Sequence, residues 1–185
     1  MTLAIEAIRS PAPRRRAETI GCALRESTLG LVLIATSNAG VCALTLGDDA
    51  ETLQRDLRRR FRAFDLAPAD RLCHRLADAV LALVETPASR VDFPLDARGS
   101  DFQRRVWDAL RDIPPGRTAS YAEVASVIGA PTAMRAVAGA CAANPVAVAI
   151  PCHRVLRSDG ALSGYRWGVD RKRALLAREG IRPPV

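Results

Sequence analysis

The sequence lacks several features that would mark particular classes of protein. No apolar run is long enough to cross a bilayer, and the N-terminus has no apolar core of the kind found in signal peptides. Only two histidines occur among the 185 residues, and no Cys-x-x-Cys pair is present. These absences argue against a membrane protein, a secreted protein and a zinc module, so we expect no metal site.

The cysteines are five in number and widely spaced, which does not suit a disulfide framework. They are Cys22, Cys42, Cys73, Cys141 and Cys152. An odd and scattered set indicates a reducing compartment, so we expect a cytoplasmic protein. Cys73 adjoins His74 instead of standing at the spacing of a zinc half-site. We interpret the cysteines other than Cys152 as small, buried hydrophobic residues.

Charge is distributed unevenly along a chain whose composition is otherwise ordinary, with 49% hydrophobic and 25% charged residues. Residues 1–98 carry 14 Arg and 13 Asp or Glu, a balance of +1. Residues 99–185 carry 13 Arg or Lys and 7 Asp or Glu, a balance of +6, which completes the net charge of +7. A basic half indicates an anionic partner, with nucleic acid the first candidate, although the same charge also serves plain solubility.

The first half of the chain predicts a small α/β domain over residues 19–98, preceded by a loose arm at 1–18. Short apolar and β-branched runs between turn residues predict an antiparallel, three-stranded sheet. Its strands cover 20–25, 31–35 and 41–46. Apolar spacing and acidic starts predict helices over 47–61 and 70–85 and, after them, a short extended piece over 91–95. The second helix would bury Leu72, Leu76, Val80 and Leu83.

The second half, residues 99–185, predicts a helical domain that contains a helix-turn-helix. Ser100 is a suitable N-cap for a helix over 101–113. Ser120 and Glu123 have the spacing of a capping box, and Gly129 follows Ala125 as in the turn between two such helices.

The next helix is predicted over 132–143, with Pro131 at its first position. It is built mainly of small residues, and Arg135 stands early on it, where a recognition helix presents side chains to a groove. A turn at 158–160 between two apolar pieces predicts a β-hairpin, which would complete a winged helix. A last helix is predicted over 170–179.

Cys152 and His153 form the pair that suggests chemistry. The thiolate is the reactive form of cysteine, and a free thiol near neutral pH is mostly protonated, so a working cysteine needs a base or a positive field. His153 is the nearest base, through direct contact or a bridging water. For an isolated Cys-His pair, the alternative is a buried structural cysteine beside a surface histidine.

Several blocks occur in a fixed order around this pair. They are Gly99-Ser100-x-Phe102-Gln103-x-x-Val106-Trp107, Ile113-Pro114-x-Gly116-x-Thr118-x-Ser120-Tyr121, Arg135-Ala136-Val137, Asn144-Pro145, Ile150-Pro151-Cys152-His153-Arg154-Val155, Gly160-x-Leu162-x-Gly164-Tyr165 and Lys172-x-x-Leu175-Leu176-x-x-Glu179. Together they resemble the O6-alkylguanine-DNA alkyltransferase family, most closely the C-terminal part of bacterial adaptive-response proteins. The resemblance implies an α+β fold with a ribonuclease-H-like N-terminal domain and a winged helix-turn-helix C-terminal domain.

The resemblance also implies roles for individual residues. Cys152 would accept the alkyl group, His153 would act as a base through a water, Glu179 would orient His153, and Asn144 would brace the turn before the cysteine. Contacts with DNA would come from Tyr121, Arg135, Ala133, Ala136 and Ser158. The pocket for the extruded base would be lined by Tyr121, Val155, Tyr165 and Arg166.

The expected function is therefore irreversible, single-turnover transfer of an alkyl group from O6-alkylguanine, and by the same chemistry from O4-alkylthymine, to Cys152. The expected partner is the minor groove of double-stranded DNA, bound by a monomer without any cofactor, with the damaged base flipped out of the stack. The alternatives are a non-enzymatic lesion-binding or regulatory DNA-binding protein and a Cys-His hydrolase. Related lesion-binding proteins lack an acceptor cysteine, whereas this chain has Cys152. A Cys-His hydrolase would leave the basic helix-turn-helix unexplained.

Overall fold

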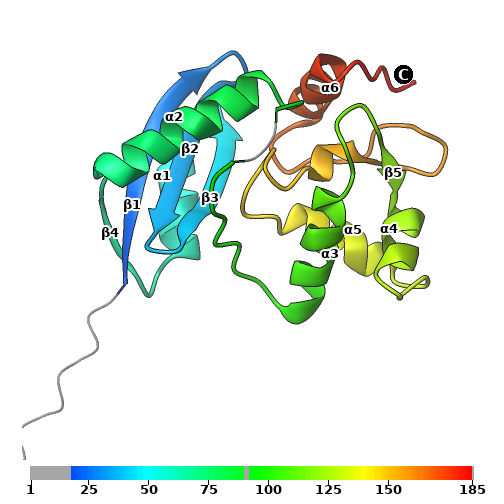
Figure 1. Ribbon diagram of the computed structural model, residues 1–185, viewed down its shortest axis with the longest axis horizontal. Helices are drawn as coiled ribbons and strands as arrows, with labels where there is room; N and C mark the ends of the chain where they lie inside the picture. The colour runs from blue at the N-terminus through cyan, green and yellow to red at the C-terminus, as the bar shows by residue number, and fades with distance from the viewer. Residues whose placement is uncertain (1–17, 90–91, 185) are drawn as a thin grey trace, which may run out of the picture.

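The computed structural model describes residues 18–89 and 92–184 as an α+β protein. A sheet with two helices forms the N-terminal part, and a group of helices forms the C-terminal part (Figure 1). The predicted class and the order of its parts are confirmed. The predicted arm lies outside the described residues except for Glu18, as does Val91 of the predicted extended piece. Within the described ranges, no helix is long and apolar enough to cross a membrane.

The sheet contains the three predicted antiparallel strands, β1 (Thr19–Ser27), β2 (Gly30–Ser37) and β3 (Gly40–Gly47). A fourth strand, β4 (Asp65–Pro68), pairs in parallel with β1, so the order is β3-β2-β1-β4 and the three-stranded prediction is wrong. The sequence of β4 has no β-branched residue and ends in proline, which is typical of an edge position and gives little strand signal.

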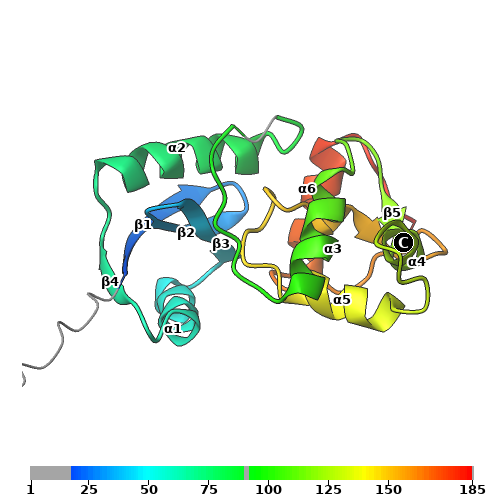
Figure 2. The same cartoon turned by 60° about the horizontal axis from the view of Figure 1, so that its bottom comes forward.

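Helices α1 (Ala50–Arg60) and α2 (Arg71–Glu85) cover opposite faces of this sheet (Figure 2). Alternate residues of a strand point to opposite faces, so Leu33 packs with the buried residues of α1 and Ile34 with those of α2. One predicted core position is wrong, because Leu72 is 42% exposed and Cys73 is fully buried. The buried stripe runs through Cys73 because a cysteine thiol behaves as a small apolar group.

The C-terminal part contains α3 (Asp101–Arg111), α4 (Tyr121–Val127), α5 (Met134–Ala142) and α6 (Val169–Arg178). The predicted N-cap at Ser100 and the predicted capping box at Ser120 are confirmed, and Ser100 also forms a capping box with Gln103. Gly129 has a φ of +70° in the turn between α4 and α5, which confirms the helix-turn-helix. Pro131 is not at the first position of α5, because that helix begins after Ala133, which caps it without a side-chain hydrogen bond.

The predicted hairpin wing is wrong. The strand β6 (Val155–Leu156) pairs in parallel with β5 (Ala119–Ser120), and within the described part residues 161–163 form no strand. A turn is present, because the amide of Arg157 donates to the carbonyl of Ala161 at 3.1 Å. The hairpin does not extend further, since Ser163 turns its side chain toward Tyr121 and Lys172.

The two parts share one continuous core, which includes residues of β2, α2, α3 and α6. The segment that leads to Cys152 is fastened to the edge of the sheet. The amide of Leu44 in β3 donates to the carbonyl of Pro145, and the amide of Ala147 donates to the carbonyl of Leu44, each at 2.9 Å. The N-terminal sheet therefore supports the backbone segment that leads to Cys152. The division at residues 98 and 99 stays a prediction.

Candidate active site

Cys152 begins a short 3₁₀ helix, η1 (Cys152–Arg154), after a buried apolar segment. Within this segment Val148 has a φ of +63°, a left-handed conformation that a β-branched residue adopts only under constraint from its surroundings. The cysteine itself is 4% exposed. A strained and buried approach fixes the position of the sulfur.

Asn144 lies between α5 and this segment and is fully buried. Its Nδ2 donates to the carbonyl of Ile150 at 2.8 Å and to Sγ of Cys152 at 3.2 Å. Its Oδ1 accepts from the amide of Val146 at 2.9 Å. One side chain thus spans both ends of the loop and contacts the sulfur, which is the arrangement expected of a brace.

His153 and Glu179 form a buried pair whose Nε2 and Oε1 atoms are 2.9 Å apart. Burial would raise the pKa of Glu179, but hydrogen bonds from His153 and Arg154 outweigh it and hold the pKa below its usual range. Because an ionised carboxylate only accepts, Nε2 carries the proton and Nδ1 keeps its lone pair. Nδ1 is buried and has no hydrogen-bond partner among the described residues.

Burial governs the protonation of the cysteine and the histidine at rest. It raises the pKa of the Cys152 thiol to about 11, and the hydrogen bond from Asn144 and the charge of Lys172 oppose it only in part. It also lowers the pKa of His153, although Glu179 opposes that change. At neutral pH the site therefore holds a protonated thiol near a neutral imidazole, which is ready to take a proton.

A pocket of about 460 Å³ opens onto Cys152. It is lined by Tyr121, Ala138, Cys141, Ala142, Cys152, Ser163, Gly164, Tyr165 and Arg166. The pocket is large enough for a small ligand. A hollow of about 550 Å³ also exists, but it lies behind the loop against Pro151 and Arg154 and does not include the sulfur, so the smaller pocket is the candidate site.

Comparison with known proteins identifies the family of this site. The profile of the 6-O-methylguanine DNA methyltransferase DNA-binding domain matches residues 101–181. The inducible methylated-DNA–protein-cysteine methyltransferase of Bacillus subtilis is 37% identical over 154 residues, which are 83% of this chain and 81% of that protein. The chain belongs to the methylated-DNA–protein-cysteine methyltransferase family.

Other family members add detail. The bifunctional transcriptional activator/DNA repair enzyme Ada of Escherichia coli is 52% identical over 157 residues, and the chain spans only 44% of that protein. The structure of Mycobacterium tuberculosis O6-methylguanine methyltransferase aligns with a TM-score of 0.69 at 37% identity, covering 90% of this chain and 96% of that one. The crystal structure of Mycobacterium tuberculosis OGT in complex with DNA aligns with a TM-score of 0.71 at 35% identity, covering 89% of this chain and 95% of that one.

The helix-turn-helix of this family member lies beside the pocket. A shallow hollow of about 260 Å³ shares Tyr121 and Ala138 with the pocket of Cys152 and is also lined by Arg135 and Ser158. Arg135, Ala136 and Ser158 are exposed, and Ala133 is half-buried. Of the predicted DNA-contacting residues, Tyr121, Arg135 and Ser158 therefore line one hollow next to the pocket, and Ala133 and Ala136 line neither hollow.

The other predicted pocket residues have different positions. Tyr165 and Arg166 line the pocket, and the hydroxyl of Tyr165 is buried without a partner in the described part of the chain. Val155 is fully buried and is not among the lining residues. Its carbonyl oxygen instead accepts a hydrogen bond from Nζ of Lys172 at 2.6 Å.

Sequence reasoning gave no role to Lys172 and Ser163, two polar residues beside the pocket. Lys172 is fully buried, and its Nζ donates to Oγ of Ser163 at 2.9 Å, while the same oxygen lies 2.7 Å from the hydroxyl of Tyr121. Burial lowers the pKa of Lys172 to about 8. A signal was present for Lys172, which is the sole lysine of the chain and belongs to the last of the ordered blocks.

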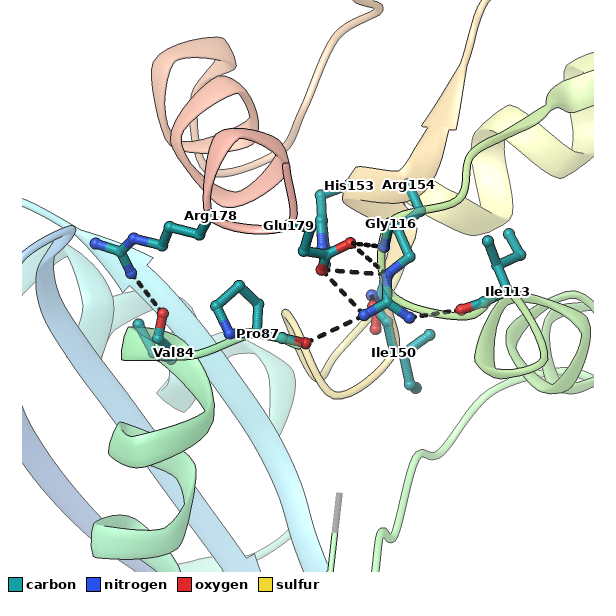
Figure 3. Close-up of polar contacts among 10 residues, drawn as sticks. Val84, Pro87, Ile113, Gly116, Ile150, His153, Arg154, Arg178 and Glu179 are labelled. Carbon is teal, nitrogen blue, oxygen red and sulfur yellow. Dashed lines mark hydrogen bonds and ion pairs between the residues drawn. The ribbon is translucent and has the colours of Figure 1, made fainter. Parts of the chain in front are cut away.

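Arg154 is a further residue without a predicted role. Its guanidinium bonds both oxygens of Glu179, with Nε at 3.0 Å from Oε2 and NH2 at 3.0 Å from Oε1 (Figure 3). It also donates to the carbonyl of Ile113 at 2.5 Å and to that of Pro87 at 3.2 Å. Its place directly after His153 gave a hint, but the choice of partners depends on segments distant in sequence.

Proposed function

We propose that this chain repairs DNA by transferring the alkyl group of O6-alkylguanine to Sγ of Cys152, once per molecule. One observation carries the proposal. Cys152 lines a pocket of about 460 Å³, and the next residue, His153, is buried with Nε2 held by Glu179 and with no hydrogen-bond partner for Nδ1 among the described residues. Family membership and the likeness to a DNA complex of a mycobacterial relative support the same conclusion.

The residues account for each step of this reaction. The thiol proton of Cys152 passes through a water to Nδ1 of His153, and Glu179 stabilises the imidazolium that forms. The thiolate then attacks the alkyl carbon, the bond from that carbon to O6 breaks, and its electron pair stays on the purine. The purine takes up a proton to become guanine, and His153 releases its proton. The product is a thioether, which does not leave, so the protein reacts once.

The substrate must leave the base stack before the sulfur can reach it, which costs a few kcal/mol. We propose that Tyr121 helps to rotate the nucleotide and that Arg135, which is exposed and sits at the mouth of the pocket, fills the space left in the duplex. The small side chains of Ala133 and Ala136 allow α5 to approach the minor groove closely. O4-alkylthymine presents the same kind of alkyl–oxygen bond and is proposed as a second substrate.

The proposed setting follows from the same features. All five cysteines are free, which suits a reducing cytoplasm. The protein would act as a monomer, because the proposed reaction uses one sulfur, one base and one pocket of a single chain.

The test uses a duplex that carries O6-methylguanine and intact-mass measurement of the protein. Wild type should gain one methyl group, located on Cys152 by peptide mapping, with no further turnover when DNA is in excess. Cys141→Ala is the matched control, because Cys141 lines the same pocket, and it should also gain one methyl group. Cys152→Ala should gain none, and full transfer to that variant would disprove the assignment.

A second measurement tests the role of Arg135. Arg135→Ala should slow transfer from duplex DNA much more than transfer from the free base O6-methylguanine, because only the duplex has a gap to fill. An equal loss on both substrates would show that Arg135 does not act in the base stack.

A further inference from the structure

Arg154 occupies an unusual place in the candidate site. Its side chain is 7% exposed, it follows His153 directly, and its guanidinium bonds Glu179, Ile113 and Pro87 at the same time. Pro87 belongs to the N-terminal part and Ile113 to the segment that follows α3, so one side chain joins the His153–Glu179 pair to two other segments (Figure 3). A planar guanidinium with five donors suits such a junction, and lysine could not reproduce it.

We infer that Arg154 is a positioning residue for alkyl transfer, which holds Glu179 in the orientation that fixes His153 and ties this pair to the N-terminal part of the protein. This inference rests on the proposed function. Arg154 acts through Glu179 and does not line the pocket of Cys152. The N-terminal part thereby gains a function in the reaction, because it holds the His153 imidazole in place.

Two arginines beside the site contact the C-terminal end of α2 in the N-terminal part. Arg154 donates to the carbonyl of Pro87 just beyond this helix, and Arg178, the neighbour of Glu179, donates to the carbonyl of Val84 at 2.6 Å. The carbonyl end of a helix carries partial negative charge, which favours both guanidinium groups. Two arginines on either side of the site therefore hold the same helix end.

The charge of Arg154 also affects the pKa of the His153 imidazole. Oε1 of Glu179 accepts from both His153 and Arg154, so the guanidinium takes up part of the negative charge that would otherwise attract a proton on the imidazole. The charged groups that act on His153 are Glu179 and Lys172 from α6 and Arg154 from η1. Of these, Glu179 favours the imidazolium and the two cations disfavour it. Loss of the Arg154 charge should therefore raise the pKa of His153, so that the imidazole becomes protonated at a higher pH.

The test compares Arg154→Gln, Arg154→Lys and Arg178→Gln with wild type. The single-turnover rate of methyl transfer is measured from about pH 5 to pH 9, the range in which an imidazole titrates. Arg154→Gln should lose on the order of a hundredfold in rate at neutral pH, the effect of misplacing a catalytic group. Its rate should also begin to fall at a higher pH than that of wild type as acid is added.

Arg154→Lys keeps the positive charge but loses the two-pronged hydrogen bonding of the guanidinium. It should recover part of the transfer rate, and the fall of its rate in acid (the acid limb of the pH profile) should lie near that of wild type. Arg178→Gln is the matched control, because Arg178 binds the same helix end but not the carboxylate of Glu179. It should lose stability without moving the acid limb. An unmoved acid limb in Arg154→Gln, or a wild-type rate in Arg154→Lys, would overturn the inference.

A readout independent of transfer separates this inference from the function on which it rests. The chain has two histidines, so ring resonances of His153 and His74 can be followed by NMR, with exposed His74 as the internal reference. His153 should titrate at higher pH in Arg154→Gln than in wild type. If wild type transfers no methyl group, the proposed function fails, and the titration still shows whether Arg154 sets the protonation of His153.

Discussion

The removal of the Asn144 amide should be among the most damaging single changes outside the reacting groups. In Asn144→Ala the buried amide of Val146 loses its acceptor, and the carbonyl of Ile150 and Sγ of Cys152 each lose a donor. An orphaned buried amide costs about 1–3 kcal/mol, and each lost hydrogen bond adds about 1 kcal/mol. We therefore expect a loss of about 3 kcal/mol or more in the free energy of unfolding.

Urea unfolding followed by tryptophan fluorescence measures this loss, because Trp107 and Trp167 are both buried. The matched control is Asn38→Ala, since Asn38 is the only other asparagine and is exposed, and it should change stability by less than about 0.5 kcal/mol. Asn144→Asp keeps the acceptor for Val146 but places a carboxylate against the sulfur, so it should slow transfer more than it destabilises the fold. If Asn144→Ala unfolds like the control, the assigned bracing hydrogen bonds do not stabilise the loop.

Two further predictions concern buried polar groups. Tyr165→Phe removes a buried hydroxyl without a partner in the described chain, so urea unfolding should show a gain of about 1 kcal/mol, and a loss would mean that the hydroxyl is bonded. Stability should also fall above pH 9.0, because burial raises the pKa of Cys42 and Cys141 to about 12 and that of Cys152 to about 11, and the unfolded chain then loses protons that the folded chain keeps. Each thiol contributes about 1.4 kcal/mol per pH unit between its unfolded and folded pKa, so Cys152→Ala should show a shallower loss of melting temperature between pH 9.0 and about 11 than wild type.

Local signals in the sequence were enough to predict most helices and several of their ends. The N-cap at Ser100 and the capping box at Ser120 depend only on residues within one helical turn, and both are present. Gly129 adopts the positive φ that the turn of a helix-turn-helix requires. The ordered blocks around Cys152 also predicted which residues form the site. The structure brings Asn144, Cys152, His153 and Glu179 together.

The features that could not be predicted depend on partners distant in sequence. The strand β4 has weak intrinsic preference and exists because the edge of β1 is available to pair with it. The wing failed for a similar reason, since β6 pairs with β5 instead of with the residues after its own turn. Arg154 belongs to the same class, because its role depends on carbonyls that lie 41 and 67 residues away along the chain.

Burial of the Cys152 sulfur has a consequence for the proposed single-turnover reaction. A thiol with a pKa of about 11 instead of 9.0 pays about 2.7 kcal/mol more to ionise, and at pH 7 only about one molecule in 10⁴ holds a thiolate. Thiolate is the form that oxidants and stray alkylating agents attack, so the resting sulfur is protected from reactions that would consume the protein without repair. In the proposed reaction, an alkylated nucleobase seated in the pocket would change this balance, because it would present the alkyl carbon to the sulfur while Nδ1 of His153 takes the proton. Under the proposed function, the burial that suppresses the resting sulfur makes transfer depend on an extruded nucleobase, so selectivity for damaged DNA would follow from the environment of one thiol.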